Sequence, residues 1–211
     1  MLDLFASAFV TLFVVIDPPG CAPIYAGLTS GAGAQQRRAM AIRATAIAAL
    51  ILLGFALFGE PLLSALHIDL DSFRIAGGIM LFIIALEMVL ERRTQRREER
   101  AERVLAQNAG TPEVEDVSVF PMAMPMIAGP GAIATVMLLA SKAQGPAATL
   151  TVLAALAVVM ALTLAGLLAA ASIVRLVGSS VESAVTRLLG VLLAALAAQY
   201  VIDGVRGSFG V

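Results

Sequence analysis

Six long apolar stretches, separated by short polar turns and one long charged segment, account for most of this chain. Each is close to the roughly 20 residues that an α-helix needs to cross the hydrocarbon core of a bilayer. The pattern therefore predicts an all-α membrane protein with six transmembrane helices. The expected spans cover residues 4–28, 40–60, 72–90, 119–141, 149–173 and 185–204.

Composition supports a bilayer environment. The 211 residues are 60% hydrophobic, with a mean hydropathy of +0.94, which is more apolar surface than a soluble domain of this length buries. A single cysteine, Cys21, excludes an intrachain disulfide. The one histidine, His67, stands in no metal-ligand or hydrolase motif. We therefore expect no enzyme activity, no cofactor, no metal site and no nucleic-acid partner.

The distribution of basic residues predicts the orientation. Loops that follow spans one, three and five hold most of them: Arg37, Arg38, six arginines from Arg92 to Arg103, and Arg175. The opposite side holds only Lys142 and Arg206, with Arg74 at a span edge. The positive-inside rule then places the 91–117 loop in the cytoplasm and both termini outside. Glu/Arg pairs at helical spacing predict a short surface helix after span three, which either contacts anionic lipid or a partner or, as we favour, is a solvated linker.

The two halves of the chain resemble each other. A shift of 111 positions lays Pro19-Gly20 on Pro130-Gly131, and a shift of 113 lays Arg74-x-x-Gly77 on Arg187-x-x-Gly190. Because each half has three spans, the second copy enters the membrane from the opposite side, so the repeat is inverted. We predict repeats at 1–90 and 118–211 joined by a 91–117 linker. Chance alignment of apolar sequence is the alternative.

Spans one and four contain helix-breaking residues at matching places. Residues 17–23 hold three prolines and a glycine, and span four contains Pro121, Pro125 and Gly129-Pro130-Gly131. Each proline removes a backbone donor, and unpaired backbone survives at membrane depth only inside protein or beside a wet cavity. The sequence therefore predicts two discontinuous helices that face a central polar site. The alternative is that these residues only kink the helices for packing.

The breaks also predict the chemistry of that site. Half-helix N-termini favour a carboxylate and freed carbonyls favour a cation, which together suit a small zwitterion. The candidate binding residues are Asp17, Pro18, Gly20, Pro23, Gly129, Pro130, Gly131 and Thr135. Asp17 is the first candidate for coupling to H⁺ or Na⁺, with an N-cap role as the alternative. Arg74 and Arg187 either support this charge, for example by pairing with Asp17, or snorkel to the interface.

Three motifs carry a resemblance to a known family. Val15-Ile16-Asp17-Pro18-x-Gly20-x-x-Pro23, Phe73-Arg74-Ile75-Ala76-Gly77-Gly78 and Phe120-Pro121-x-Ala123-x-Pro125-x-Ile127-Ala128-Gly129-Pro130-Gly131 resemble the MarC family of bacterial and archaeal inner-membrane proteins. The resemblance implies a six-span protein distantly related to LysE-type exporters. It also implies transport of small neutral amino acids such as glycine and alanine, coupled to Na⁺ or H⁺. Pro19 departs from the branched aliphatic residue that the family often has there.

The leading hypothesis is accordingly a secondary transporter of a small neutral solute in the inner membrane. Membrane lipid and the solute are its expected partners, and a homo-oligomer is compatible with the sequence. Two other classes remain open at this point. One is a membrane scaffold or stress-linked partner-binding protein whose working surface is the Arg/Glu loop, and the other is a passive channel.

Overall fold

The computed structural model describes residues 1–92, 95–96, 99, 102, 116–170, 172 and 179–210. These residues are almost entirely helical. The elements are α1 (Leu2–Ile16), α2 (Pro18–Leu28), α3 (Ala34–Ala65), α4 (Leu70–Val89), the π-helical segment η1 (Ser118–Ile127), α6 (Pro130–Lys142), α7 (Pro146–Leu168) and α9 (Ser179–Phe209). Arg175, most of the 91–117 linker and the surface helix expected there lie outside the described residues.

The predicted spans correspond to these helices. Five stretches are long and apolar enough to cross a membrane, namely α1 with α2, α3, α4, α7 and α9. The segments η1 and α6 meet at an angle of 54° and make a sixth span if the bent pair crosses as one. The all-α, multi-span architecture predicted from the hydrophobic pattern is confirmed.

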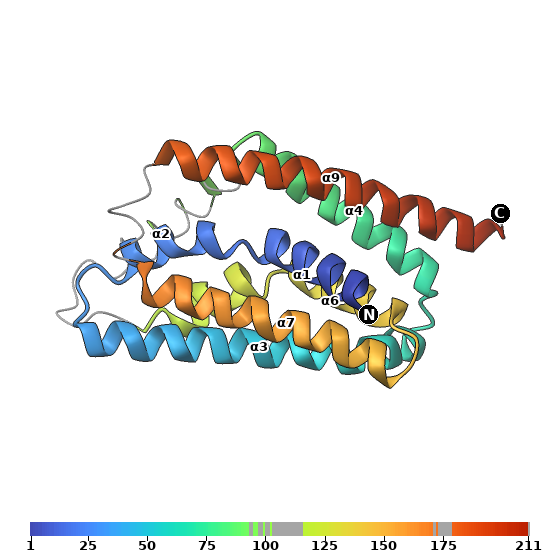
Figure 1. Ribbon diagram of the computed structural model, residues 1–211, viewed down its shortest axis with the longest axis horizontal. Helices are drawn as coiled ribbons and strands as arrows, with labels where there is room; N and C mark the ends of the chain where they lie inside the picture. Colours follow the sequence, from blue (N-terminus) through green and yellow to red (C-terminus); the bar gives the residue numbers. More distant parts are fainter. Residues whose placement is uncertain are drawn as a thin grey trace.

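The first span lies at the centre of the bundle. Of its most apolar window 56% is buried, against 28% for α3, α4 and α9. Leu12, Ile16, Cys21 and Tyr25 are among its fully enclosed side chains. Figure 1 shows α1 and α2 between the α4–α9 pair on one side and α3 with α7 on the other. The Pro/Gly-containing first span is thus surrounded by protein, as its interrupted backbone requires.

Helices from the two halves pack against each other. The first span packs on α7, the η1–α6 span packs on α3, and α4 lies along α9. Each interrupted span therefore contacts the long second helix of the opposite half. This arrangement agrees with the matched sequence halves, while the inverted duplication itself stays a prediction.

The helices α4 and α9 form a closely packed pair. An ideal Cβ built on Gly78 would lie 2.8 Å from the Ala197 carbonyl oxygen, and one built on Gly190 would lie 2.9 Å from the Met88 Cβ. Small residues let membrane helices approach until their backbones touch, which maximises van der Waals contact. The absence of side chains at Gly78 and Gly190 thus lets α4 and α9 pack as one unit.

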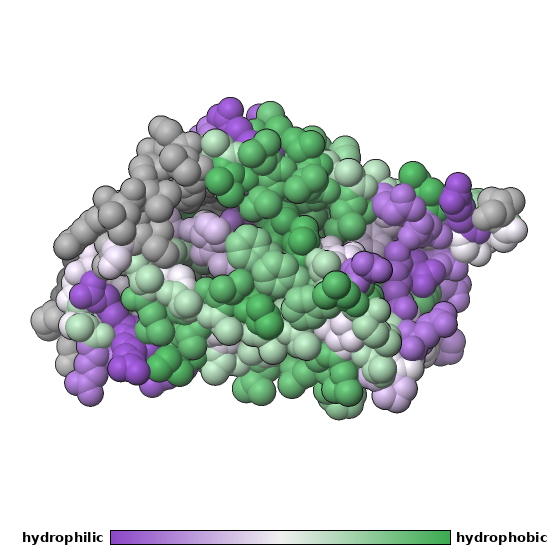
Figure 2. Space-filling model, in the orientation of Figure 1, coloured by the Kyte–Doolittle hydropathy of each residue, from purple (hydrophilic) through white to green (hydrophobic). Residues whose placement is uncertain are grey.

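The outer surface carries an apolar belt bounded by charge. Large side chains such as Leu50, Phe58, Ile83 and Leu188 are exposed, and Figure 2 shows apolar residues over the middle of one face with hydrophilic residues toward both ends. Ion pairs mark those ends. At the end with the chain termini, which we call the terminal end, the pairs are Arg74–Asp71 and Lys142–Asp203. At the opposite end, which we call the linker end, they are Arg43–Asp116, Arg96–Glu87 and Arg187–Glu91.

The substitution Gly78→Ala tests the α4–α9 seam. The added methyl meets the α9 backbone, so we expect a loss on the order of 1–3 kcal/mol from overpacking, larger than the gain of about 1 kcal/mol in helix propensity. Melting in detergent can be followed through a thiol-reactive fluorophore, because the single cysteine, Cys21, is fully buried until the protein unfolds.

Gly54→Ala is the matched control, since a Cβ there meets nothing within 4 Å. Its melting temperature should stay equal or rise. Equal behaviour of the two variants would show that the seam tolerates a methyl group and that the pair is not close-packed.

Candidate functional site

The first break is a single residue that caps the helix after it. The helix α1 ends at Ile16, Asp17 adopts a left-handed conformation (φ 59°, ψ 64°), and α2 begins at Pro18. The Asp17 carboxylate accepts a hydrogen bond of 3.2 Å from the Gly20 amide. Asp is one of the few residues that tolerate this conformation, and a carboxylate is a favoured N-cap. The N-cap role weighed for Asp17 is therefore confirmed.

Gly20 is required by this cap. An ideal Cβ on Gly20 would lie 2.3 Å from the Asp17 Oδ2 atom, so a larger residue would push the carboxylate away from the helix end. The carboxylate is almost wholly buried, with 3% of the residue exposed. The N-terminus of α2 is thus already occupied by an anionic group of the chain itself, and α1 and α2 run on as one 27-residue span.

The second break is built differently. Gly129 occupies the N-cap position of α6 with extended backbone, no side chain caps the helix, and Pro130 is its first residue. The Ile133 amide donates to the Gly129 carbonyl over 3.0 Å. Among the described residues, no side chain caps the amides of Gly131 and Ala132, so these donors at the positive end of the α6 dipole are open to a ligand.

A pocket of about 180 Å³ lies at this helix end, between the α4–α9 unit and the rest of the bundle. Val15, Ile84, Glu87, Arg96, Pro125, Met126, Ile127, Gly129, Pro130, Gly131 and Ala132 line it. Glu87 is one-fifth exposed and forms an ion pair with Arg96. The pocket therefore combines backbone amides that favour an anion with a carboxylate that favours a cation.

The structure brings together only part of the predicted site. Gly129, Pro130 and Gly131 line the pocket just described. The residues of the first break, with Thr135, line neither this pocket nor the larger one at the linker end: Asp17, Pro18, Gly20, Pro23 and Thr135. Thr135 is fully buried, and its hydroxyl has no hydrogen-bond partner among the described residues. Val15, directly before the first break, is the link between the two regions, because its side chain lies 3.6 Å from an ideal Cβ on Gly131.

Comparison with known proteins identifies the family. A family model described as "MarC family integral membrane protein" matches residues 2–209. The chain belongs to the MarC family. It is similar to a UPF0056 membrane protein of Archaeoglobus fulgidus (36% identity, covering 96% of this chain and 92% of the relative) and to UPF0056 membrane protein YvbG of Bacillus subtilis (33%, covering 99% and 97%).

A third relative is UPF0056 inner membrane protein YhgN of Escherichia coli, with 32% identity over 95% of each chain. No solved structure matches the sequence significantly. The resemblance inferred from the three motifs is confirmed over nearly the whole chain, and this MarC-family protein is an integral, multi-pass membrane protein.

The two candidate supporting arginines of this MarC-family chain lie at opposite ends of the α4–α9 pair. Arg74 pairs over 2.6 Å with Asp71 on the preceding turn of α4, rather than with Asp17. Arg187 pairs over 2.6 Å with Glu91 at the linker end. Both arginines thus bind carboxylates near helix ends, away from either break.

Glu87 is the pocket residue that the sequence did not single out. Its side chain is one-fifth exposed and lines the pocket together with Ile84, three residues earlier on the same face of α4. The sequence does show an acidic residue inside an otherwise apolar span. The direction in which its side chain points depends on how α4 packs against α6, which the sequence pattern does not specify.

Substitutions of Asp17 test its role as a helix cap through the stability of the protein. Asparagine keeps a side-chain acceptor and tolerates the left-handed backbone, so Asp17→Asn should melt close to the wild type. Alanine loses the cap and is strained at positive φ, so Asp17→Ala should lose about 1–2 kcal/mol. The rate of Cys21 labelling on heating measures the stability of both variants. A large loss of stability in Asp17→Asn would contradict a simple cap and show that the negative charge itself stabilises the fold.

Proposed function

We propose that this protein is a secondary transporter of a small neutral solute, namely a small neutral amino acid such as glycine or alanine. The observation that carries the proposal is the pocket at the second break, where an uncapped helix N-terminus and the Glu87 carboxylate share one cavity. Family membership agrees with this proposal, because three motifs resemble those of MarC proteins, some of which resemble amino-acid transporters.

The charges of the pocket match a zwitterion. The amides of Gly131 and Ala132 offer donors to a substrate carboxylate, and Glu87 offers an acceptor to a substrate ammonium. Arg96, which pairs with Glu87, gives up this partner when the ammonium binds. Val15 and Ile84 form the apolar wall against which a short side chain lies.

The size of the pocket favours a small substrate. A volume of about 180 Å³ is below the roughly 300–1,000 Å³ of pockets that enclose drug-sized ligands. Gly131 sets this volume, because a Cβ at that position would lie 2.3 Å from the Ile84 Cδ1 atom. Glycine and alanine fit the remaining space better than longer amino acids.

The helix arrangement suggests how the pocket opens to each side. Glu87 and Ile84 belong to the close-packed α4–α9 unit, whereas Val15 and the α6 N-terminus belong to the rest of the bundle. A small rotation between these two bodies widens or closes the pocket. The inverted repeat proposed for residues 1–90 and 118–211 provides two oppositely oriented copies for such alternating access.

Coupling and orientation complete the proposal. We assign the coupling ion, Na⁺ or H⁺, to the buried Asp17 region, where a carboxylate lies inside the first span. The protein lies in the inner membrane with both termini outside and the 91–117 segment in the cytoplasm, following the excess of arginine at the linker end. The inner-membrane name of the Escherichia coli relative supports this location.

Uptake by proteoliposomes that contain the purified protein tests the function directly. We expect labelled alanine and glycine to accumulate against their gradient when a Na⁺ or H⁺ gradient is imposed. Flux that only equilibrates under every gradient would indicate a passive channel. Absence of flux for all small amino acids, from protein that melts normally, would overturn the transport proposal.

Two pocket variants test the site. Glu87→Gln should raise the KM for alanine at least about tenfold, because a charge-assisted hydrogen bond contributes about 1.5–3 kcal/mol. Gly131→Ala narrows the pocket and should reduce alanine uptake more than glycine uptake.

Glu60→Gln and Gly54→Ala are the matched controls, since Glu60 is exposed on α3 and a Cβ at Gly54 meets nothing within 4 Å. Both should transport like the wild type. Normal kinetics in Glu87→Gln together with an unchanged alanine-to-glycine ratio in Gly131→Ala would move the site elsewhere in the protein.

A further inference from the structure

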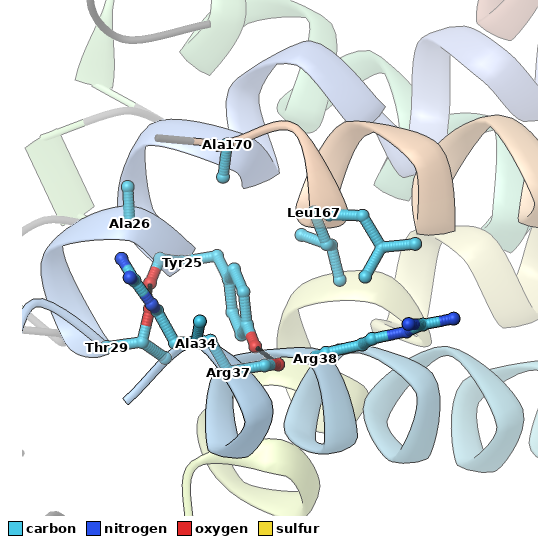
Figure 3. A pocket seen from close by; sticks show the side chains of 9 residues that line it. Tyr25, Ala26, Thr29, Ala34, Arg37, Arg38, Leu167 and Ala170 are labelled. Atoms are coloured by element: carbon cyan, nitrogen blue, oxygen red, sulfur yellow. Dashed lines mark hydrogen bonds between the residues drawn. The ribbon is translucent and has the colours of Figure 1, made fainter. Parts of the chain in front are cut away.

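A second, larger pocket of about 410 Å³ opens at the linker end of the bundle. It lies where α2 turns into α3 and where α7 ends (Figure 3), and it shares no lining residue with the pocket at the second break. Tyr25, Ala26, Thr29, Ala34, Arg37, Arg38, Leu167, Leu168 and Ala170 line it. The transport proposal uses none of these residues.

The pocket has cationic groups, and none of its lining residues in the described part of the chain is acidic. Five other basic side chains pair with carboxylates of the described chain: Arg43, Arg74, Arg96, Lys142 and Arg187. No carboxylate among the described residues pairs with Arg37 or Arg38. Two guanidinium groups beside one pocket, without an anion from the chain, favour an anionic ligand.

Local backbone structure adds to this positive potential. The helix α3 begins at Ala34, in the pocket wall, with Gly33 as an N-cap that provides no side-chain bond. The positive end of a 32-residue helix therefore faces the same space as the two arginines.

One hydrogen bond joins two walls of the pocket: the Tyr25 hydroxyl of α2 donates to the Arg37 carbonyl oxygen of α3. At the end of α2, the Thr29 hydroxyl donates to the Tyr25 carbonyl oxygen over 2.7 Å. Figure 3 shows the Tyr25 ring between α2 and α3, with Arg38 extending along α3 on the same side of Tyr25 as Leu167. A cation and an apolar wall are therefore presented together rather than on separate surfaces.

The position in the membrane selects the ligand. The pocket lies at the linker end of the spans, which we place at the level of the lipid head groups, and its lining includes the apolar side chains of Leu167 and Leu168 beside the arginines. A soluble anion would make no use of that surface. Basic pockets between membrane helices at this depth bind anionic lipid head groups.

We propose that this pocket binds one anionic phospholipid from the leaflet at the linker end, with its phosphate held by Arg37 beside the α3 N-terminus or by Arg38 on the Leu167 side, and an acyl chain against Leu167 and Leu168. The bound lipid joins the ends of α2, α3 and α7. It therefore stabilises the bundle at the point where the first and second spans meet.

Native mass spectrometry of the full chain in detergent, titrated with phosphatidylglycerol or phosphatidylcholine, tests the proposal. We expect one phosphatidylglycerol to be retained preferentially. Arg37→Gln and Arg38→Gln should each weaken its binding by about fivefold or more, which is the effect of one basic residue near an anionic surface. The conservative variants Arg37→Lys and Arg38→Lys should restore much of the binding.

Arg92→Gln is the matched control, because Arg92 is exposed at the same end and lines neither pocket. Phosphatidylglycerol binding by Arg92→Gln should change by less than about twofold. A loss of binding equal to that of Arg38→Gln would indicate unspecific attraction to the surface and overturn the site. Ala26→Phe fills the pocket without changing charge and should also abolish selective retention.

Competition with inorganic phosphate distinguishes the source of the anion. Phosphate at millimolar concentration should not displace phosphatidylglycerol or raise the melting temperature, because it lacks the apolar contacts. If phosphate raised the melting temperature as much as phosphatidylglycerol does, the lipid assignment would be overturned in favour of a soluble phosphate-type ligand. Equal retention of phosphatidylcholine and phosphatidylglycerol would overturn the role of the arginines.

Discussion

A peptide group at membrane depth needs a hydrogen-bond partner, because the hydrocarbon offers none. Pro and Gly interrupt two spans of this protein, and each interruption has to restore partners within the chain. At the first, one residue leaves the helix and returns its own carboxylate to the next helix as a cap. At the second, the backbone is extended at Phe120 and Met124, each directly before a cis-proline. Bonds such as that from the Met122 amide to the Val117 carbonyl span these residues, and the segment meets α6 at 54°.

These two solutions determine how the helices pack. A self-capped first span stays nearly continuous and can be enclosed on all sides, so it becomes the centre of the bundle. The bent second span cannot fill the space beside α4 in the same way, and a pocket remains at the bend. The helix α4 is joined to α9 by glycine contacts and also packs closely against α6 at Gly77 and Gly131, so the pocket lies at the interface between the α4–α9 pair and the bent span.

Much of this architecture follows from sequence patterns. Span number and position depend on apolar length, and the breaks depend on Pro and Gly, so both were predictable. The Arg74–Asp71 pair has i,i+3 spacing, and helical geometry alone could have indicated it. Two features required the tertiary structure. Which role Asp17 plays depends on one left-handed backbone conformation, and whether Glu87 faces water or a pocket depends on the rotation of α4 against α6.

The difference between the breaks is the physical basis of the ligand chemistry proposed for the second one. Asp17 and Gly129 occupy the same N-cap position relative to Pro18 and Pro130. In the first half, the chain itself places a carboxylate on a buried half-helix N-terminus, which shows that this environment accepts that group. In the second half, glycine leaves the equivalent helix end open to a pocket that already contains the acceptor Glu87. Under the proposed function, a ligand with its own carboxylate and an ammonium group would supply at α6 the interaction that Asp17 supplies at α2.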